Sequence, residues 1–547
     1  MEANTELEPV PVSALAAALG LEGDEVRSYG PLAAKIELSA LDRLASKPDG
    51  RIVSVTSMTP TRFGEGKTTT SISLVQGLAR IGERPILCLR EPSLGPVFGI
   101  KGGGTGGGRA QLVPMEEINL HFTGDIHAIG AANNLLAAMV DAHLLHGNEL
   151  GLDPHSISWR RCMDLDDRTL RQIVLGLGGR ANGIPREAGF DITAASEVMA
   201  VVAVAQDLAD LRARLGAITV GSTFEGERVT AAQIGAAGSM TVLLKEALKP
   251  NLVQTTEGNP ALVHCGPFAN IAHGNNSLIA DRLGIKLGDF VVTESGFGAD
   301  MGFEKFVDIV CRLGGFSPSV VVLVATVQAL KHHGGDPDGG LSALERGFDN
   351  LSAALGIVRR FGLNCVVAIN RSPRDEAADI DAARRLANEL GAEGVAVNEG
   401  FELGGAGTTE LAAAVVEAAI APTELSYLYS LEQPIEKKIE AIAIGAYGAA
   451  SVALSPLARA QAETFEVGGL GGLPICIAKT HLSLSHDPTW LGAPSGFTLP
   501  VGELRAYTGA GWIVAICGDM QTMPGLPQDS AARRIDLDAV GATVGLR

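Results

Sequence analysis

One segment near the N-terminus limits the possible folds more than any other. Residues 52–78 read IVSVTSMTPTRFGEGKTTTSISLVQGL: a β-branched apolar run, a turn with two glycines, then Lys67 and Thr68 opening an apolar-periodic helix. This order is typical of a phosphate-binding loop, because N–H groups and the helix dipole at a helix start attract phosphate oxygens. Lys67 can reach the terminal phosphate, and the Thr68 hydroxyl can hold Mg²⁺. The segment predicts ATP binding.

The match covers only the second half of the usual loop motif. The usual pattern has a glycine six residues before the lysine, and here that position is Thr61. The alternative is a strand-to-helix turn without a ligand, but a lysine at a helix N-terminus opposes the dipole and favours an anion there. The residues predicted to bind ATP are Thr61, Arg62, Phe63, Gly64, Glu65, Gly66, Lys67 and Thr68.

Short apolar runs recur along the chain before glycine-rich turns and longer Ala/Leu-rich segments. They lie at residues 52–56, 85–89, 290–293, 320–325 and 365–370. Strands that are apolar throughout belong to parallel sheets covered by helices on both faces. We therefore expect an α/β fold with a P-loop NTPase-like, mostly parallel sheet core and two smaller α/β domains. The expected domains are residues 1–358, 359–456 and 457–547.

Charge and cysteine content exclude several classes of protein. A net charge of −19 opposes binding to nucleic acid, whose affinity for proteins comes from Lys and Arg. The start of the chain lacks the basic segment and apolar core of a signal peptide, and no apolar run approaches the roughly 18 residues of a membrane helix. Seven scattered cysteines, with no zinc-ligand spacing, indicate reduced core thiols. We expect a cytoplasmic protein without nucleic-acid or membrane partners.

A longer stretch carries a family resemblance. Residues 90–129 read REPSLGPVFGIKGGGTGGGRAQLVPMEEINLHFTGDIHAI. Here the chain resembles formate–tetrahydrofolate ligase, also called formyltetrahydrofolate synthetase. The likeness continues through residues 176–200, 244–277 and 291–312 and on to the C-terminus, so it covers essentially the whole sequence.

The resemblance implies an ATP-dependent ligase of one-carbon metabolism. Such an enzyme joins formate to N10 of tetrahydrofolate through formyl phosphate, giving 10-formyltetrahydrofolate, ADP and phosphate. Lys67 would stabilise the transferred phosphoryl group, and Arg90 matches the arginine that holds formate near the γ-phosphate. A structural arginine paired with Glu91 or another carboxylate is the alternative for Arg90. The family also implies a homotetramer and activation by a monovalent cation, potassium or ammonium.

Several polar segments near these residues have two possible interpretations. The glycine tract at residues 101–109 could close over an acyl phosphate or be a flexible surface loop. Asp300 and Glu304, four residues apart, can share one helix face, and a solvated or ion-paired face is the favoured interpretation. Glu257, His264, Asn270 and His273 could orient substrate or be buried polar groups that fix loops. His121, Asp125 and His127 bring titratable groups toward the same region or have polar roles in the core, and they are assigned no proton-transfer step.

The chain departs from the family where folate is expected to bind. The family holds the flat pteridine ring between two aromatic side chains. At the first position this chain has Ser372 and Pro373 instead of a Phe, and at the second it has Phe401 instead of a Trp, whereas Phe297 matches. Losing one stacking face would weaken folate binding by roughly threefold to tenfold. The predicted folate-binding residues are Phe297, Ser372, Pro373 and Phe401.

Three functions stay open at this stage. The first is the ordinary ligase with a looser folate pocket. The second is a family paralogue that activates formate or another small carboxylate for a modified folate or a different amine. The third is a P-loop assembly or switch ATPase, although residues 62–64 match poorly the Lys-Gly-Gly that such ATPases carry before the loop.

Overall fold

The computed structural model describes residues 8–62, 64–99, 103–269, 271–518 and 520–546. Twelve strands of these described segments form one sheet in the order β1–β2–β13–β14–β4–β15–β3–β16–β17–β18, with β6 beside β13 and β5 beside β6. Pairing is parallel from β14 to β18 in this order and antiparallel at the β1 end. The expected α/β fold with a mostly parallel sheet is confirmed. The strands are β1 (Val26–Tyr29), β2 (Ala33–Ile36), β3 (Arg51–Ser57), β4 (Pro85–Leu89), β5 (Gly106–Gly107), β6 (Ala110–Val113), β13 (Asn251–Thr255), β14 (Pro260–Val263), β15 (Phe290–Glu294), β16 (Pro318–Thr326), β17 (Cys365–Asn370) and β18 (Gly394–Asn398).

Helices cover both faces of this sheet, which explains why its central strands are apolar throughout. On one face, Val53 and Val55 of β3 belong to the same core as Leu74 of α3 (Lys67–Arg80) and residues of α17 (Thr409–Ala418). On the other face, Ile52 of β3 and Val321 of β16 share a core with α11 (Leu278–Leu287) and α14 (Leu341–Arg360). The strand pattern therefore predicts the layers correctly.

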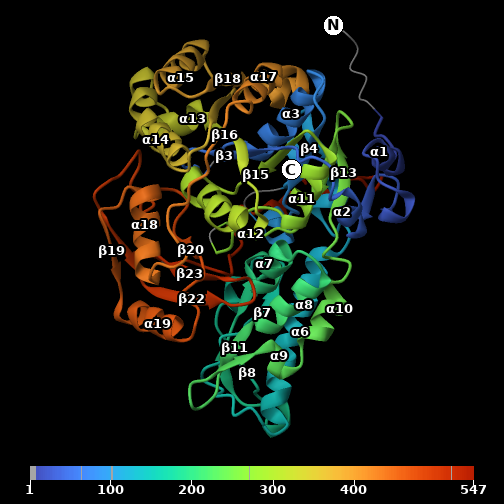
Figure 1. The fold of residues 1–547 in the computed structure, drawn as a ribbon, viewed down its shortest axis with the longest axis vertical. Coiled ribbons are helices and arrows are strands. Elements are labelled where there is room, and N and C mark those ends of the chain that lie inside the picture. The colour runs from blue at the N-terminus through green and yellow to red at the C-terminus, as the bar shows by residue number, and fades with distance from the viewer. Residues whose placement is uncertain (1–7, 63, 100–102, 270, 519, 547) are drawn as a thin grey trace.

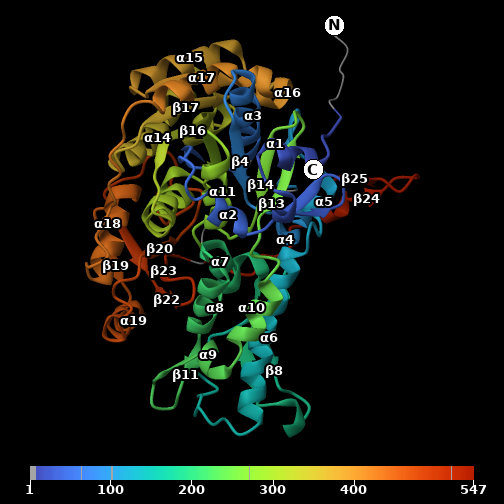
Figure 2. The ribbon, with the colours of Figure 1, turned by 45° about the vertical axis from the view of Figure 1, so that its right-hand side comes forward.

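A helical lobe extends away from the sheet, below it in Figure 1 and Figure 2. Among the described residues, its helix α6 is long and apolar enough to cross a membrane by length and composition. Polar residues interrupt α6, and its Asp141 accepts hydrogen bonds from Arg161 and Arg186, each at 2.8 Å. Ile129, Leu136 and Val140 of α6 are buried in the protein core. The lobe comprises α6 (Asp125–Leu145), β7 (Arg161–Met163), β8 (Ile173–Leu175), β9 (Arg186–Ala188), β10 (Phe190–Ile192), α7 (Glu197–Val204), α8 (Leu208–Ala217), β11 (Thr219–Ser222), β12 (Arg228–Thr230), α9 (Ala231–Ile234) and α10 (Ala237–Leu244).

The C-terminal part packs beside both the sheet and the lobe (Figure 1). Its three-stranded sheet has the order β20–β23–β22, and β19 pairs with β21. Across position 358, where a domain division was expected, β17 and β18 continue the large sheet. The domain limits at 358 and 456 stay predictions. The elements of this part are α18 (Ile435–Tyr447), β19 (Ser451–Leu454), α19 (Pro456–Val467), β20 (Ile475–Ala478), β21 (Thr498–Val501), β22 (Glu503–Tyr507) and β23 (Trp512–Ile516). The last two strands, β24 (Asp536–Leu537) and β25 (Thr543–Val544), lie on the opposite side of the molecule in Figure 2.

The remaining helices are short or flank the sheet. Two consecutive π-helical segments, Ala299–Phe303 and Phe306–Cys311, follow β15. The others are α1 (Val12–Ala18), α2 (Ser39–Leu44), α4 (Leu94–Phe98), α5 (Met115–Asn119), α12 (Arg312–Gly314), α13 (Val327–His333), α15 (Ala377–Glu389) and α16 (Gly400–Leu403), and the 3₁₀ turns are Gly23–Glu25, Arg168–Leu170, Arg180–Asn182, Thr193–Ala195, Gly404–Thr408 and Ala531–Arg533.

Candidate active site

The predicted phosphate loop lies at the carboxyl end of β3, the edge at which open parallel sheets bind ligands. Gly64 and Gly66 have φ of +77° and +72°. A Cβ atom at Gly66 would also lie only 3.0 Å from Nδ2 of Asn370. Position 66 therefore requires glycine, because only glycine adopts this left-handed conformation at little cost. The turn delivers the chain directly into the first turn of α3.

Side chains from neighbouring strands fix the loop in place. Glu65 accepts hydrogen bonds from the backbone N–H of Thr61 (2.7 Å) and from the hydroxyl of Thr326 (2.9 Å) at the end of β16. Asn370, the last residue of β17, donates to the Glu65 carbonyl (2.9 Å) and accepts from the Thr70 hydroxyl (2.9 Å). The loop is thus held before any ligand arrives, which lowers the entropic cost of binding.

The Lys67 side chain points back toward the carboxyl end of β3, the strand that precedes the loop. Its ammonium donates to the hydroxyl of Ser57 at 3.2 Å. Burial lowers the pKa of Lys67, and the negative charges of Glu294 and Glu65 partly offset this effect. An ammonium that is poorly solvated and opposes the helix dipole gains strongly from an anion placed beside it.

Glu294 joins the two residues predicted to be catalytic or metal-binding, although the sequence interpretation did not include it. It is the last residue of β15, between β4 and β3 in the sheet. One oxygen accepts from the Thr68 hydroxyl at 2.6 Å, and the other accepts from the Arg90 guanidinium at 3.3 Å. Its side chain is only 7% exposed. The available signal was an acidic residue ending an apolar run, but strand order cannot be read from the sequence.

Arg90 follows β4 and reaches the same edge of the sheet. Besides Glu294, its guanidinium donates to the carbonyl of Pro267 at 3.3 Å. A Cβ atom at Gly296 would lie 3.1 Å from both terminal nitrogens of Arg90. The side chain is 26% exposed, so the cation is accessible from the site. The carboxylate that pairs with Arg90 is Glu294, whereas Glu91 is buried.

Phe297 lies next to the phosphate loop. Its backbone carbonyl accepts a hydrogen bond at 3.0 Å from Ser57, the residue that also contacts Lys67. Its φ of +62° is rare for a bulky side chain and marks a strained turn after β15. The ring stacks on His481, with centroids 4.3 Å apart and planes 20° from parallel.

The other predicted folate residues follow β17 and β18. The N–H of Ser372 donates to Asp375 within an exposed turn that also carries Pro373 (2.7 Å). Phe401 is 49% exposed, and its carbonyl accepts from the N–H of Arg109 at 2.9 Å. Phe401 thus lies against the glycine tract, while the described hydrogen bonds of Ser372 stay within its own turn.

Several other predicted residues have structural partners. His264 contacts the hydroxyl of Ser277 (2.6 Å) and the carbonyl of Ala247 (2.7 Å), and burial lowers its pKa to about 4. Glu257 accepts from Arg80 and from the N–H of Gly405, both at 2.8 Å. His273 is buried, and burial also lowers its pKa to about 4. Asp125 is ion-paired with Lys35 at 2.8 Å. His121 and His127 are exposed.

The expectation for Asp300 and Glu304 needs correction. Both side chains are buried, Asp300 within the first π-helical segment and Glu304 directly after it, so neither faces solvent. Asp300 is ion-paired, with Lys479 at 2.6 Å. Burial raises the pKa of Glu304 well above its usual range. Phe63, Asn270 and residues 101–102 of the glycine tract lie outside the described residues.

Comparison with known proteins identifies the family of this chain. Residues 1–547 match the family model described as "Formate--tetrahydrofolate ligase". The chain belongs to this family. The formate–tetrahydrofolate ligase of Roseiflexus sp. (strain RS-1) is 54% identical over 549 residues, covering 98% of this chain and 97% of the relative. That of Paracoccus denitrificans (strain Pd 1222) is 52% identical over 546 residues, covering 99% and 98%. The resemblance to formate–tetrahydrofolate ligases that residues 90–129 carry is confirmed.

Proposed function

We propose that this chain joins formate to N10 of tetrahydrofolate and converts ATP to ADP and phosphate in the same reaction. The observation that carries the proposal is the network of Thr68, Glu294 and Arg90 beside the held phosphate loop, at the carboxyl edge of the sheet. Relatives at 54% and 52% identity that carry the name formate–tetrahydrofolate ligase support the same activity.

Lys67 and the first N–H groups of α3 would bind the β- and γ-phosphates of ATP. The hydroxyl of Thr68 and the carboxylate of Glu294 lie 2.6 Å apart and offer the hard oxygen ligands that Mg²⁺ prefers. Mg²⁺ bound with ATP would supply neutralisation of phosphate charge. Thr68 and Glu294 would hold this ion, and the Arg90 guanidinium beside Glu294 would bind an incoming anion.

Formate is a weak nucleophile, so its position matters more than its activation. Arg90 would hold the formate carboxylate in line with the γ-phosphorus. One formate oxygen bonds to the γ-phosphorus, and the bond to the bridging oxygen of ADP breaks, giving formyl phosphate. Lys67 would neutralise charge on the transferred group. N10 of the folate then attacks the formyl carbon, phosphate leaves with the C–O bonding pair, and N10 loses its proton to solvent.

The acceptor pocket would be formed by Phe297, Phe401, Ser372 and Pro373. The position of Phe297 supports this proposal, because its backbone carbonyl accepts a hydrogen bond from Ser57, which also contacts Lys67. Phe401 supports it through its contact with the glycine tract, which would close over the acyl phosphate. The exposed turn at Ser372 favours a second candidate, a paralogue whose acceptor is a modified folate or another amine.

We also propose the quaternary and cellular setting that the family suggests: a cytoplasmic homotetramer activated by potassium or ammonium. Exposed Val242 and Leu243 on α10 support self-association, which light scattering would test. The seven cysteines are all buried and unpaired, as suits a reducing compartment.

The test is product formation by the purified chain. With ATP, Mg²⁺ and tetrahydrofolate, ADP release should require formate, and the product should be 10-formyltetrahydrofolate. ADP release without any carboxylate would refute the ligase proposal. ADP release with formate but without formyltetrahydrofolate, even at high folate, would favour the second candidate. Omission and restoration of potassium in the same assay would test the cation.

A further inference from the structure

The stacked pair of Phe297 and His481 joins two segments that are far apart in sequence. Phe297 lies in the turn after β15, and His481 lies in the loop after β20. Their ring centroids are 4.3 Å apart with an interplanar angle of 20°. Because aromatic rings at this distance are already in contact, each ring covers one face of the other.

This spacing determines which face of Phe297 a substrate can use. A flat ring needs about 3.5 Å of separation on each side, so a ring between two others requires about 7 Å. The observed 4.3 Å leaves no room for a pteridine between Phe297 and His481. A flat substrate ring that stacks on Phe297 would therefore use the face opposite His481.

A buried ion pair ties together the two segments that carry the rings. Asp300 follows Phe297 by three residues, and Lys479 precedes His481 by two. Their side chains are 1% and 0% exposed and lie 2.6 Å apart. Separating these two desolvated charges would cost free energy, because it would leave each buried charge unpaired. The ion pair thus fixes the distance between the segments at the base of the stack.

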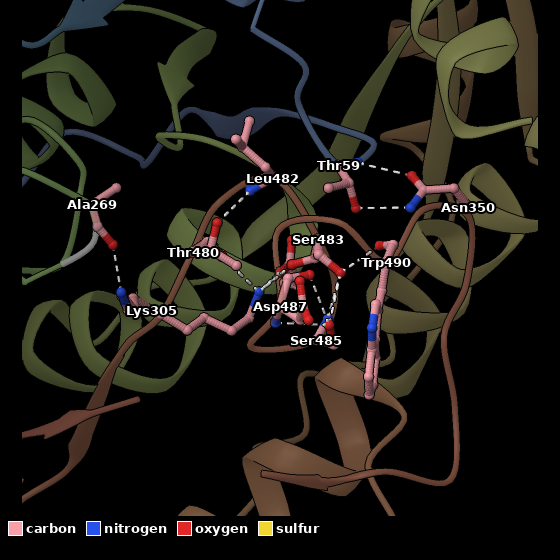
Figure 3. Close-up of polar contacts among 12 residues, drawn as sticks. Thr59, Ala269, Lys305, Asn350, Thr480, Leu482, Ser483, Ser485, Asp487 and Trp490 are labelled. Carbon is pink, nitrogen blue, oxygen red and sulfur yellow. Dashed lines mark hydrogen bonds and ion pairs between the residues drawn. The ribbon is translucent and has the colours of Figure 1, made fainter. Parts of the chain in front are cut away.

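The loop that carries His481 is itself well ordered by polar contacts (Figure 3). The Lys479 ammonium also donates to the carbonyls of Ser483 (2.6 Å) and Thr480 (3.1 Å). Ser483 donates to the Trp490 carbonyl at 2.7 Å. On the Phe297 side, a Cβ atom at Gly302 would lie 2.0 Å from the Gly296 carbonyl oxygen, so the turn is closely packed.

We propose that His481 is a positioning residue of the acceptor pocket. It supports one face of Phe297, so that Phe297 presents only its other face, in a fixed orientation, to the flat ring of the acceptor. Asp300 and Lys479 hold the support in place. This inference rests on the proposed function, in which Phe297 contacts the folate. His481 itself does not contact the folate and acts through Phe297.

The test compares His481→Ala, which removes the supporting ring, with His481→Phe, which keeps it. Steady-state kinetics would be measured with tetrahydrofolate, ATP and formate varied in turn. For His481→Ala we expect the KM for tetrahydrofolate to rise about threefold to tenfold, the range that one aromatic contact supports. The kcat value and the KM values for ATP and formate should change less than about twofold, a separation that a general loss of structure would not give. His481→Phe should restore the KM for tetrahydrofolate.

His486→Ala is the matched control, since His486 lies in the same loop and contacts Trp490 and Phe497 instead. It should leave the KM for tetrahydrofolate unchanged. Asp300→Asn and Lys479→Met should raise this KM as His481→Ala does, and the His481 pair decides the question if these variants do not fold. An unchanged or lower KM for tetrahydrofolate in His481→Ala would overturn the proposal, a lower value meaning that His481 occupies the site of the substrate ring. Failure of the unmodified protein to form formyltetrahydrofolate would instead refute the proposed function.

Discussion

Replacing Glu294 by Gln should change nucleotide binding in opposite directions with and without Mg²⁺. In the structure, Glu294 accepts from the Thr68 hydroxyl at 2.6 Å and closes the end of the phosphate loop with a negative charge. Free ATP must bring its phosphates toward this charge, whereas Mg²⁺ bound to ATP is attracted by it. The neutral amide of Gln keeps the shape of the side chain and removes both effects.

The size of the effect follows from the geometry. A phosphate oxygen that contacts Thr68 would lie about 5 Å from the Glu294 carboxylate, because two hydrogen-bond lengths meet at the hydroxyl. Two like unit charges at that distance repel by about 0.8 kcal/mol in water and about 3 kcal/mol at the effective dielectric constant of a partly buried site. Glu294 is 7% exposed, and an intermediate value of about 1.4 kcal/mol corresponds to a tenfold change.

Calorimetric titration of the unmodified protein and of Glu294→Gln, each with ATP in EDTA and with ATP in excess Mg²⁺, would measure this. We expect the variant to bind free ATP about tenfold more tightly and Mg²⁺-ATP several-fold more weakly. Glu37→Gln, which removes a carboxylate paired with Lys249 outside this site, is the control and should change neither affinity. Equal shifts of both affinities in Glu294→Gln would refute the reasoning, because a general distortion of the loop acts on both forms of the nucleotide.

Three further predictions test other parts of the molecule. Lys67→Ala should abolish ADP release while the thermal melting temperature stays within a few degrees, and a fully active variant would remove Lys67 from the mechanism. Ser372→Phe should lower the Kd for tetrahydrofolate roughly threefold to tenfold by restoring a stacking face, with Arg374→Phe in the same turn as the control; an unchanged Kd would show that another group fills the gap. His264 has a pKa lowered from about 6.5 in the unfolded chain to about 4 in the fold, so its contribution to stability falls as pH drops below about 6.5, by about 2 kcal/mol at pH 5. His264→Gln should therefore lose less thermal stability between pH 7 and pH 5 than the unmodified protein, and equal losses would contradict the assignment.

The sequence predicts those features of the site that depend on local order along the chain. The strand, the glycine turn, Lys67 and the helix are adjacent in sequence, and they form the predicted order of strand, turn and helix. Gly66 is an example: its left-handed φ is a local property of the turn, and glycine is the residue expected at such a position. The layers of the sheet could also be predicted, because strands covered on both faces are apolar throughout.

Features that depend on strand order could not be predicted. Glu294 reaches Thr68 and Arg90 only because β15 lies between β3 and β4, and no local pattern encodes that arrangement. The partners of Asp300 and Phe297, which are Lys479 and His481, come from a loop about 180 residues later in the chain. A spacing of four residues favoured a solvated or ion-paired helix face for Asp300 and Glu304. The ion pair of Asp300 with Lys479 agrees with this interpretation, but the surrounding packing buries both acidic side chains.

The hydrogen bonds of Asn370 have a consequence for the order in which substrates bind. Asn370 holds the carbonyl of Glu65 in the phosphate loop, and the backbone two residues later forms the exposed turn at Ser372. Nucleotide bound to the loop would therefore also restrain the turn where the acceptor is expected. This restraint would raise the affinity for the acceptor. By thermodynamic reciprocity, bound acceptor would then raise the affinity for nucleotide by the same factor. The two substrates would show synergistic binding, and Asn370 would carry the coupling free energy between them.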